Sequence, residues 1–213
     1  MLTEHNPLAK ARRSRMRRAL KGETPTFLCP NCIGGILFHD LGLQFRSPTV
    51  NTMMLQTDFV RFVLNLDHYL EQELCFFDHP EYPFPCAKLD DITVHFTHYH
   101  TEAEAAEKWK ARTARMDREN LFVFLTERDG LTEEEIRSLA LVKARGMVVF
   151  TANSHPEIPY VLQIPKYAPD GEVGNILAQS YLDGSREYEK YFDFVKWFNE
   201  ADGRPFDISA FQK

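Results

Sequence analysis

Two cysteines and a histidine are the side chains of this 213-residue chain whose types and spacing best suit chemistry. Cys29 and Cys32 form a C-x-x-C spacing directly before Gly34 and Gly35. A cysteine at the start of a helix is favoured as a thiolate, and a histidine beside it can make it a nucleophile. His98 is the best candidate for that partner, an acid or a base, because it lies in a predicted strand-to-helix turn.

The cysteines also allow other interpretations. Zinc needs more ligands than one pair, and Cys75 and Cys86 are too far apart to form a second C-x-x-C. A redox pair needs its first cysteine exposed at a helix start, whereas Cys29 falls in a predicted strand. The sequence therefore predicts no metal site, places Cys29 in the core, and leaves Cys32 either reactive or a small packing residue.

An anionic ligand could bind where the predicted strand 26–29 runs through a turn into the predicted helix 34–41. The start of a helix offers backbone N–H groups without intrahelical acceptors and the positive end of the helix dipole. We therefore expect Asn31, Gly34 and Gly35 to face the anionic part of a donor molecule.

Two further groups could extend this donor site. Ser47 and Thr49, in the polar loop 46–51, could donate hydroxyl hydrogen bonds to a sugar or phosphate, or could instead bond to each other in a turn. Lys108 could face an anionic ligand or could simply be solvated. Glu104 lies one turn before it, at the third position of a predicted helix, where a capping box explains it without chemistry.

The aromatic and imidazole neighbours of His98 have mainly structural explanations. His95 lies inside the predicted strand and is expected to be a satisfied core group. His100 could form an H-x-H metal pair with His98, but no third ligand is evident nearby. Trp109 is expected in the core rather than as a platform for a sugar ring.

Strands and helices alternate along almost the whole chain. This alternation predicts a three-layer α/β fold with a mainly parallel, Rossmann-like sheet, preceded by a basic N-terminal helix. Cys75 falls in a strand that we expect to be buried, which would make it an inert core thiol. The strands are predicted at 26–29, 74–77, 92–96, 121–125, 146–150 and 160–164, and the helices at 34–41, 57–72, 101–116, 132–140 and 188–198.

The length suits an N-terminal helix over residues 1–22 and one α/β domain over 23–213, with two lobes divided near 80–90 as the alternative.

The charge is distributed unevenly along the chain. Residues 1–22 carry a net charge of +6 and the whole chain −6, so the remainder carries −12. This asymmetry indicates an anionic partner for residues 8–21, for which we favour a membrane surface. Nucleic acid is not expected, because no aromatic residue is interleaved with the arginines.

The composition is that of a globular protein, with 44% hydrophobic and 26% charged residues. No apolar run approaches the roughly 20 residues of a membrane span, and the basic N-terminus has no apolar segment of a signal peptide behind it. Four cysteines are too few for a disulfide framework in a chain of this size. We therefore expect reduced thiols and a cytoplasmic protein, with peripheral binding at the inner face of the membrane.

Several of these stretches together resemble a bacterial family of exopolysaccharide or capsular polysaccharide biosynthesis proteins, domain of unknown function family 1919. The resemblance covers about residues 10–165 and implies a role in surface-polysaccharide assembly. It rests on T-F-L-C-P-N-C-I-G-G at 26–35, L-G-L-Q-F-R-S-P-T-V at 41–50, D-F-V-R-F-V-L-N-L-D-H-Y-L at 58–70, I-T-V-H-F-T-H-Y-H-T-E-A-E-A-A-E-K-W at 92–109 and N-L-F-V-F-L at 120–125.

The chain departs from the family pattern at a few positions beside the candidate site. Pro30 stands where the family usually has asparagine, and Ile33 where it has tryptophan. Asn51 and Thr52 replace a usual Gly-Leu pair. Where such residues contact the substrate in relatives, the departures imply a different specificity.

These observations support three hypotheses for function. The first is a transferase that moves a sugar or a sugar substituent from an activated anionic donor, such as a nucleotide sugar or acyl-CoA, to a glycan or lipid-linked glycan. The donor is a co-substrate, and no resident cofactor is expected. The second is an acyltransferase or hydrolase that acts through Cys32 and His98. The third is a non-catalytic assembly or regulatory protein of the same pathway.

Overall fold

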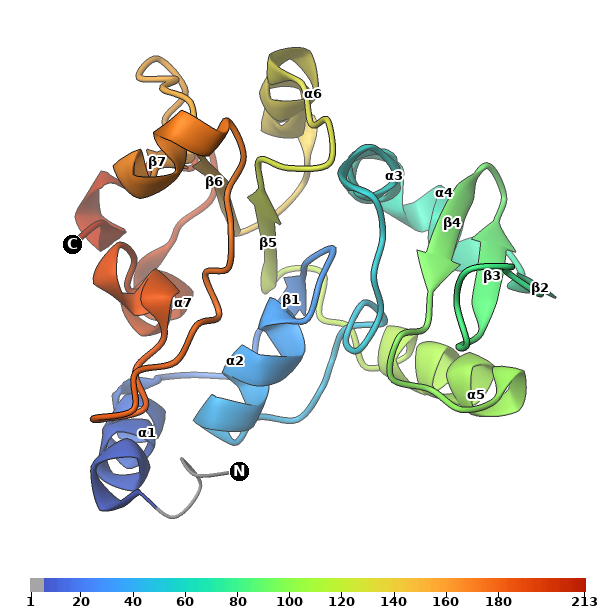
Figure 1. Ribbon diagram of the computed structural model, residues 1–213, viewed down its shortest axis with the longest axis horizontal. Coiled ribbons are helices and arrows are strands. Elements are labelled where there is room, and N and C mark those ends of the chain that lie inside the picture. Colours follow the sequence, from blue (N-terminus) through green and yellow to red (C-terminus); the bar gives the residue numbers. More distant parts are fainter. Residues whose placement is uncertain (1–5) are drawn as a thin grey trace.

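The computed structural model describes residues 6–213, and its centre is a sheet of four parallel strands (Figure 1). Residues 1–5, with which the predicted N-terminal segment begins, lie outside the described residues. The strand order is β1-β5-β6-β7, with every neighbouring pair parallel. The strands are β1 (Thr26–Leu28), β5 (Leu121–Thr126), β6 (Gly146–Thr151) and β7 (Val161–Gln163).

Apolar side chains cover both faces of this sheet because residues of a strand alternate in direction. Along β5, Phe122 and Phe124 belong to one core cluster, whereas Val123 and Leu125 belong to the other. Helices α2 (Ile33–Leu41) and α7 (Phe194–Glu200) contribute to the first cluster, and α3 (Gln56–Leu64) and α6 (Glu133–Ser138) to the second. This arrangement confirms the predicted three-layer α/β fold.

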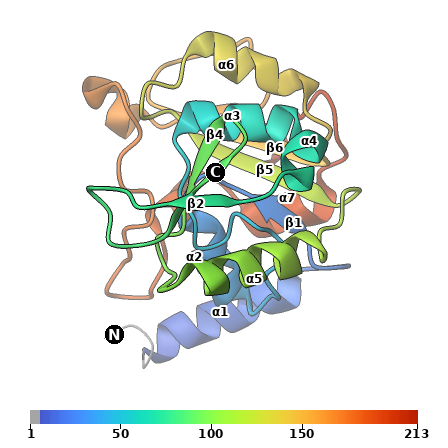
Figure 2. The same cartoon turned by 90° about the vertical axis from the view of Figure 1, so that its right-hand side faces the viewer.

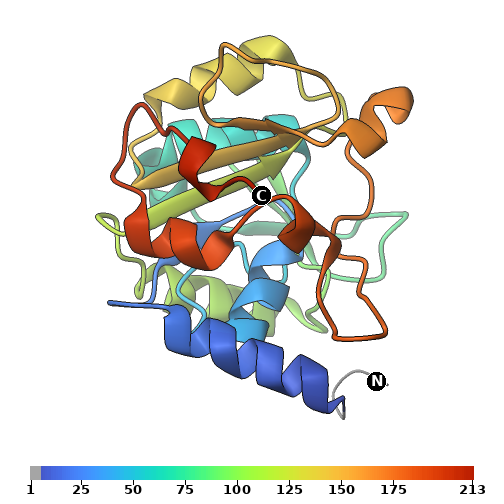
Figure 3. The same ribbon diagram turned by 90° about the vertical axis from the view of Figure 1, so that its left-hand side faces the viewer.

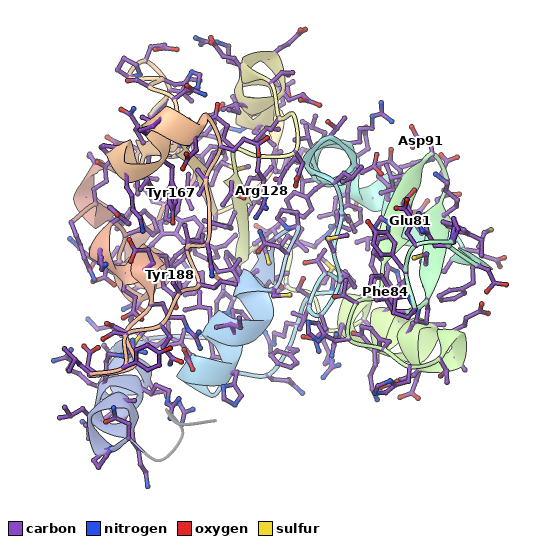
Figure 4. The ribbon with its side chains drawn as sticks, viewed as in Figure 1. Glu81, Phe84, Asp91, Arg128, Tyr167 and Tyr188 are labelled. Atoms are coloured by element: carbon purple, nitrogen blue, oxygen red, sulfur yellow. The ribbon has the colours of Figure 1, made fainter. Side chains whose placement is uncertain are left out.

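Figure 4 shows side chains filling both layers. Tyr167 and Tyr188 lie on the side of the sheet that carries α7, and both belong to the first core cluster. Phe84 lies on the opposite side, beside the strands of a second sheet.

That second sheet is small and antiparallel, with the order β2-β3-β4 (Figure 2). It lies beside α3, α4 (Leu66–Glu71) and α5 (Glu102–Thr113). The segments 74–77 and 92–96 were predicted as strands of the main sheet, and the structure corrects this. The strands are β2 (Cys75–Phe77), β3 (Cys86–Leu89) and β4 (Ile92–His95).

Two features of the small sheet explain the correction. A tight turn at Asp90, with φ of 57°, folds β3 directly back onto β4, so the two strands pair locally instead of entering the main sheet. β2 lies at the edge of the sheet, and Cys75 is exposed there. The expectation of a buried core thiol at Cys75 was therefore wrong.

The predicted helix 57–72 is interrupted once. Asn65 leaves helical geometry with φ of −123° and ψ of 42°, which separates α3 from α4. The apolar side chains Phe59, Phe62 and Tyr69, on both sides of the break, are all buried in the second cluster. Residues 78–85 connect β2 with β3, two neighbouring strands of one sheet.

The basic helix α1 (Pro7–Ala19) packs on the body through part of its arginines. Arg12 forms an ion pair with Glu189 at 2.5 Å, and Arg17 donates hydrogen bonds to the carbonyl oxygens of His39 and Asp40 at the end of α2. Cations are stabilising at the C-terminus of a helix, where the dipole is negative.

Among the described residues, no helix is long and apolar enough to cross a lipid bilayer.

The chain also contains short 3₁₀ turns, which connect the larger elements. They are Leu139–Leu141, Pro165–Asp170, Glu187–Lys190 and Ser209–Phe211. The last predicted helix, 188–198, is thus divided into a 3₁₀ turn and α7.

Candidate functional site

Cys32 and His98, which are 66 residues apart in the sequence, meet in the folded chain. The Cys32 Sγ atom lies 3.4 Å from the His98 Nε2 atom. Cys32 stands immediately before α2, after the end of β1. His98 arrives from the turn between β4 and α5, so two elements from opposite sides of the main sheet supply the pair.

A pocket of about 410 Å³ opens at this pair. It includes three predicted site residues, namely Cys32, Gly35 and His98. The other lining residues are Ile36, His39, Phe45, Asn51 and Arg186. No local motif in the sequence distinguishes His39, Phe45 or Arg186 as a site residue.

The turn before α2 orients the thiol. The Asn31 Oδ1 atom accepts a hydrogen bond from the N–H of Ile33, the first residue of α2, at 3.1 Å, which forms an Asx turn directly before the helix. Cys29 points away from the pocket into the core, and its Sγ donates to the carbonyl oxygen of Asn31 at 3.2 Å. Asn31 thus positions Cys32 through the backbone, while Cys29 is the packing residue that the sequence predicted.

The two glycines of α2 have different neighbours. A Cβ atom on Gly34 would lie 2.7 Å from the Cys29 sulfur, so this glycine allows the helix to approach β1. A Cβ atom on Gly35 would lie 3.0 Å from the Asn51 Oδ1 atom, so this glycine keeps the pocket open. Gly35 is the third residue of α2, where an α-helix leaves N–H groups without intrahelical acceptors. Gly34 therefore shapes the core, and only Gly35 can contact a ligand in the pocket.

Ser47 and Thr49 do not line the pocket. Both are fully buried, and their hydroxyl oxygens lie 2.9 Å apart. The Thr49 Oγ1 atom accepts a hydrogen bond from the N–H of Cys29 at 3.3 Å, which ties this loop to the end of β1. The structure therefore places neither hydroxyl where a donor could touch it, and the pair forms the self-bonded turn of the second interpretation.

Asn51 follows this turn and lines the pocket. It adopts a left-handed conformation with φ of 65°, which glycine adopts without strain and asparagine tolerates better than most residues. In the family resemblance, this position corresponds to the glycine of a Gly-Leu pair. The chain thus adds a side-chain amide to the pocket that a glycine would not supply.

Two buried side chains from the α5 region hold Asn51 in place. Arg112 donates to the carbonyl oxygen of Val50 at 2.7 Å, and the Tyr99 hydroxyl donates to the same oxygen at 3.1 Å. Since Tyr99 follows His98 directly and Val50 precedes Asn51, the hydrogen bond between Tyr99 and Val50 fixes the positions of both His98 and Asn51. In the sequence, Arg112 cannot be distinguished from a solvated arginine on a helix, because its burial depends on partners that only the folded chain brings to it.

Burial controls the protonation of both cysteines. It raises the pKa of Cys29 to about 12 and the pKa of the half-buried Cys32 above the ordinary value of a thiol. Cys32 is therefore a protonated thiol at neutral pH. Attack by its sulfur requires a base within reach, and His98 Nε2 is in position to accept the proton.

The remaining candidates lie away from the pocket. Lys108 is not among the pocket residues and pairs with Glu107 at 3.0 Å on α5. Glu104 accepts a hydrogen bond from the N–H of His100 at 3.3 Å, as a residue at a helix start does. His95 and Trp109 are buried, which agrees with their structural interpretation.

The cysteines take no part in a metal-ligand cluster of the described residues. One group of three ligand side chains occurs within residues 6–213, formed by Glu133, His155 and Glu157. Arg137 forms ion pairs with both glutamates of that group. These carboxylates thus already have a cationic partner, and we assign no metal to them.

Comparison with known proteins finds a family match over a longer part of the chain than the resemblance covers. A family model described as "Domain of unknown function (DUF1919)" matches residues 4–199. An uncharacterized protein of Haemophilus influenzae is 39% identical over 186 residues, which cover 87% of this chain and 89% of the relative.

Proposed function

The chain belongs to the DUF1919 family of domains of unknown function, and from this membership and the pocket we propose that it is a cysteine-dependent acyltransferase of surface-polysaccharide biosynthesis. It would move an acyl substituent from an activated anionic donor, such as a CoA thioester, to a hydroxyl of a glycan. The observation that carries the proposal is the 3.4 Å contact between Cys32 Sγ and His98 Nε2 inside a pocket. The polysaccharide pathway rests on the family resemblance.

In the first half-reaction Cys32 Sγ attacks the carbonyl carbon of the donor thioester while His98 Nε2 accepts the thiol proton. The carbonyl oxygen becomes negatively charged, and the N–H of Gly35, in the first turn of α2, would stabilise it by a hydrogen bond. The carbon–sulfur bond to the donor then breaks. The donor thiolate takes the proton from His98 and leaves, and the acyl group stays on Cys32 as a thioester.

In the second half-reaction a glycan hydroxyl gives its proton to His98 and attacks the acyl carbon. An ester bond to the glycan forms, the bond to Cys32 breaks, and the sulfur recovers its proton from His98. Water in place of the glycan would make the same residues a hydrolase.

The lining of the pocket favours acyl transfer over sugar transfer. None of the described residues that line it is an aspartate or a glutamate, the groups that act as acid, base or nucleophile in most sugar chemistry. The pocket instead offers a thiol and an imidazole, with Arg186 as the cation for an anionic donor. All four cysteines are free, which suits the cytoplasm that we propose for the reaction.

The test is acylation of the whole protein by acetyl-CoA, followed by mass spectrometry. We expect one hydroxylamine-sensitive acetyl group on Cys32 in the wild type and none in Cys32→Ala. His98→Ala should slow the acylation about 100- to 10,000-fold. Cys75→Ala is the matched control, because Cys75 is an exposed free thiol outside the pocket, and it should be acylated on Cys32 like the wild type.

Two outcomes would contradict the proposal. Full transfer activity in Cys32→Ala would exclude the covalent route. A melting temperature that rises with nucleotide sugars but not with acyl-CoA would indicate sugar transfer, since only a ligand of the folded state stabilises it.

A further inference from the structure

Three exposed, large apolar side chains lie together at the beginning of α1. Leu8 is 63% exposed, Tyr181 86% and Leu182 82%. Asn6 joins the two segments, because its Nδ2 donates to the carbonyl oxygens of Tyr181 at 3.3 Å and Leu182 at 2.9 Å. Figure 3 shows the place: α1 forms the lower edge of the molecule, and the loop 177–186 descends to its N-terminal end.

This loop is held by its own hydrogen bonds and by α1. The N–H of Ser180 donates to the carbonyl oxygen of Ser185 at 2.8 Å, and the N–H of Gly184 donates to that of Ser180 at 3.0 Å. Gly184, with φ of 69°, lies so close to Ala9 that a Cβ atom would approach its methyl group to 2.7 Å. Arg12 donates to the carbonyl oxygen of Gly184 at 2.9 Å. The tip with its two apolar side chains is therefore built into the fold.

The basic side chains of α1 divide between two faces. Arg12, Arg13 and Arg17 turn toward the body and bond to other elements. The outward cations, all exposed, are Lys10, Arg15 and Arg18 on the helix and Lys21 just beyond it. Of these, Arg15 and Lys21 also line the groove between α1 and α7. At about 100° per residue, the three on the helix span an arc of roughly 140° on the outer face.

We propose that this basal surface, formed by Leu8, Tyr181, Leu182 and the outward cations of α1, docks on an anionic lipid surface. The cations would bind lipid phosphates, and the tyrosine and leucines would enter the boundary between headgroups and acyl chains. Charge complementarity supports this partner, because residues 23–213 carry a net charge of −12 and would be repelled from the same surface. The protein would therefore dock in one orientation.

The apolar tip of the loop, Tyr181 and Leu182, is separated from the pocket residue Arg186 by only a few residues of the chain. Arg186 ends the same loop, lines the pocket, and bonds Asp40 of α2 at 3.3 Å. Arg13 of α1 lies 3.7 Å from the same carboxyl group. A lipid-linked glycan could thus reach Cys32 from the lipid surface. This last step rests on the proposed function, whereas the docking does not.

The test is sedimentation with vesicles of phosphatidylcholine and phosphatidylglycerol in equal parts, and with vesicles of phosphatidylcholine alone. We expect binding to the anionic vesicles that weakens at high salt. Lys10→Ala/Arg15→Ala/Arg18→Ala should weaken it about 100-fold, and Tyr181→Ser/Leu182→Ser about tenfold. The matched controls, Lys110→Ala/Lys143→Ala and Leu141→Ser, change exposed residues elsewhere and should bind like the wild type.

Absence of binding to anionic vesicles at low salt would overturn the proposal. Wild-type binding by both basal variants, Lys10→Ala/Arg15→Ala/Arg18→Ala and Tyr181→Ser/Leu182→Ser, would also overturn it. Duplex DNA is added as a competitor. If it binds the wild type and Tyr181→Ser/Leu182→Ser equally well, and as tightly as the vesicles do, the surface is a general polyanion-binding patch and the proposal of a lipid surface is wrong. Acylation of Cys32 in the basal variants, measured separately, distinguishes lost docking from lost catalysis.

Discussion

At the level of single residues, the candidate chemistry depends on a protonated thiol. A helix N-terminus favours a thiolate, but burial opposes it, and the pKa of Cys32 is raised on balance. His98 therefore has to take the proton during attack rather than hold a preformed thiolate. Asn51 adds an amide to the same pocket in a left-handed conformation that glycine would adopt freely.

The raised pKa of Cys32 can be tested by the pH dependence of its alkylation. Since the thiolate is the reactive form, the rate with iodoacetamide should keep rising at pH values where N-acetylcysteine has already reached its plateau. The rate is measured by mass spectrometry of the peptide that contains Cys32. A midpoint at or below that of N-acetylcysteine would show a preformed thiolate–imidazolium pair and would contradict the mechanism.

At the level of elements, α2 links the core to the pocket through two adjacent glycines. Gly34 faces the Cys29 sulfur and Phe27, which are buried and cannot move aside cheaply. Gly35 faces the end of the Asn51 side chain, which can move. The same substitution at the two positions should therefore have different consequences.

Gly34→Ala should lower the free energy of unfolding by about 1–3 kcal/mol, because the new methyl group overpacks the core. Gly35→Ala should leave that free energy nearly unchanged, since a gain in helix propensity of about 1 kcal/mol offsets a small displacement. It should nevertheless reduce acyl transfer, up to about 100-fold for a shift of ~1 Å at Asn51. Urea unfolding and acylation rates measure the two effects, and equal loss of stability in both variants would contradict the distinction.

At the level of the whole molecule, the two tryptophans lie on opposite faces of the main sheet. Trp109 of α5 belongs to the core cluster that includes α3, and Trp197 of α7 to the cluster that includes α2. Both clusters share strands β1, β5 and β6. A sheet packed on both faces should lose both clusters together when it unfolds.

Thermal unfolding of Trp109→Phe and Trp197→Phe tests the prediction of one domain over residues 23–213. Each variant leaves one tryptophan as the reporter of one face, and far-ultraviolet circular dichroism reports the backbone. We expect fluorescence and circular dichroism to give one coincident transition within each variant. Fluorescence and circular dichroism midpoints that differ within a variant would favour two lobes that unfold separately.

The sequence by itself determined much of the local structure of this protein, although not the break at Asn65 or the division of the last predicted helix. The spacing of apolar residues, the glycines and the capping residues predict the strand, turn and start of α2 and the α/β class, because these depend on neighbours within a few positions. Candidate residues Cys32, Gly35 and His98 were also found, since their elements end where an α/β sheet exposes side chains.

Only the tertiary structure decided which of these elements meet. Strand β4 pairs with β3 in a separate sheet, and yet its following turn brings His98 to Cys32. Arg186 reaches the pocket from far along the chain, while Ser47 and Thr49 turn inward to hold β1. Strand pairing and packing between distant segments depend on contacts that no local pattern encodes, and so only the folded chain shows which side chains complete the pocket.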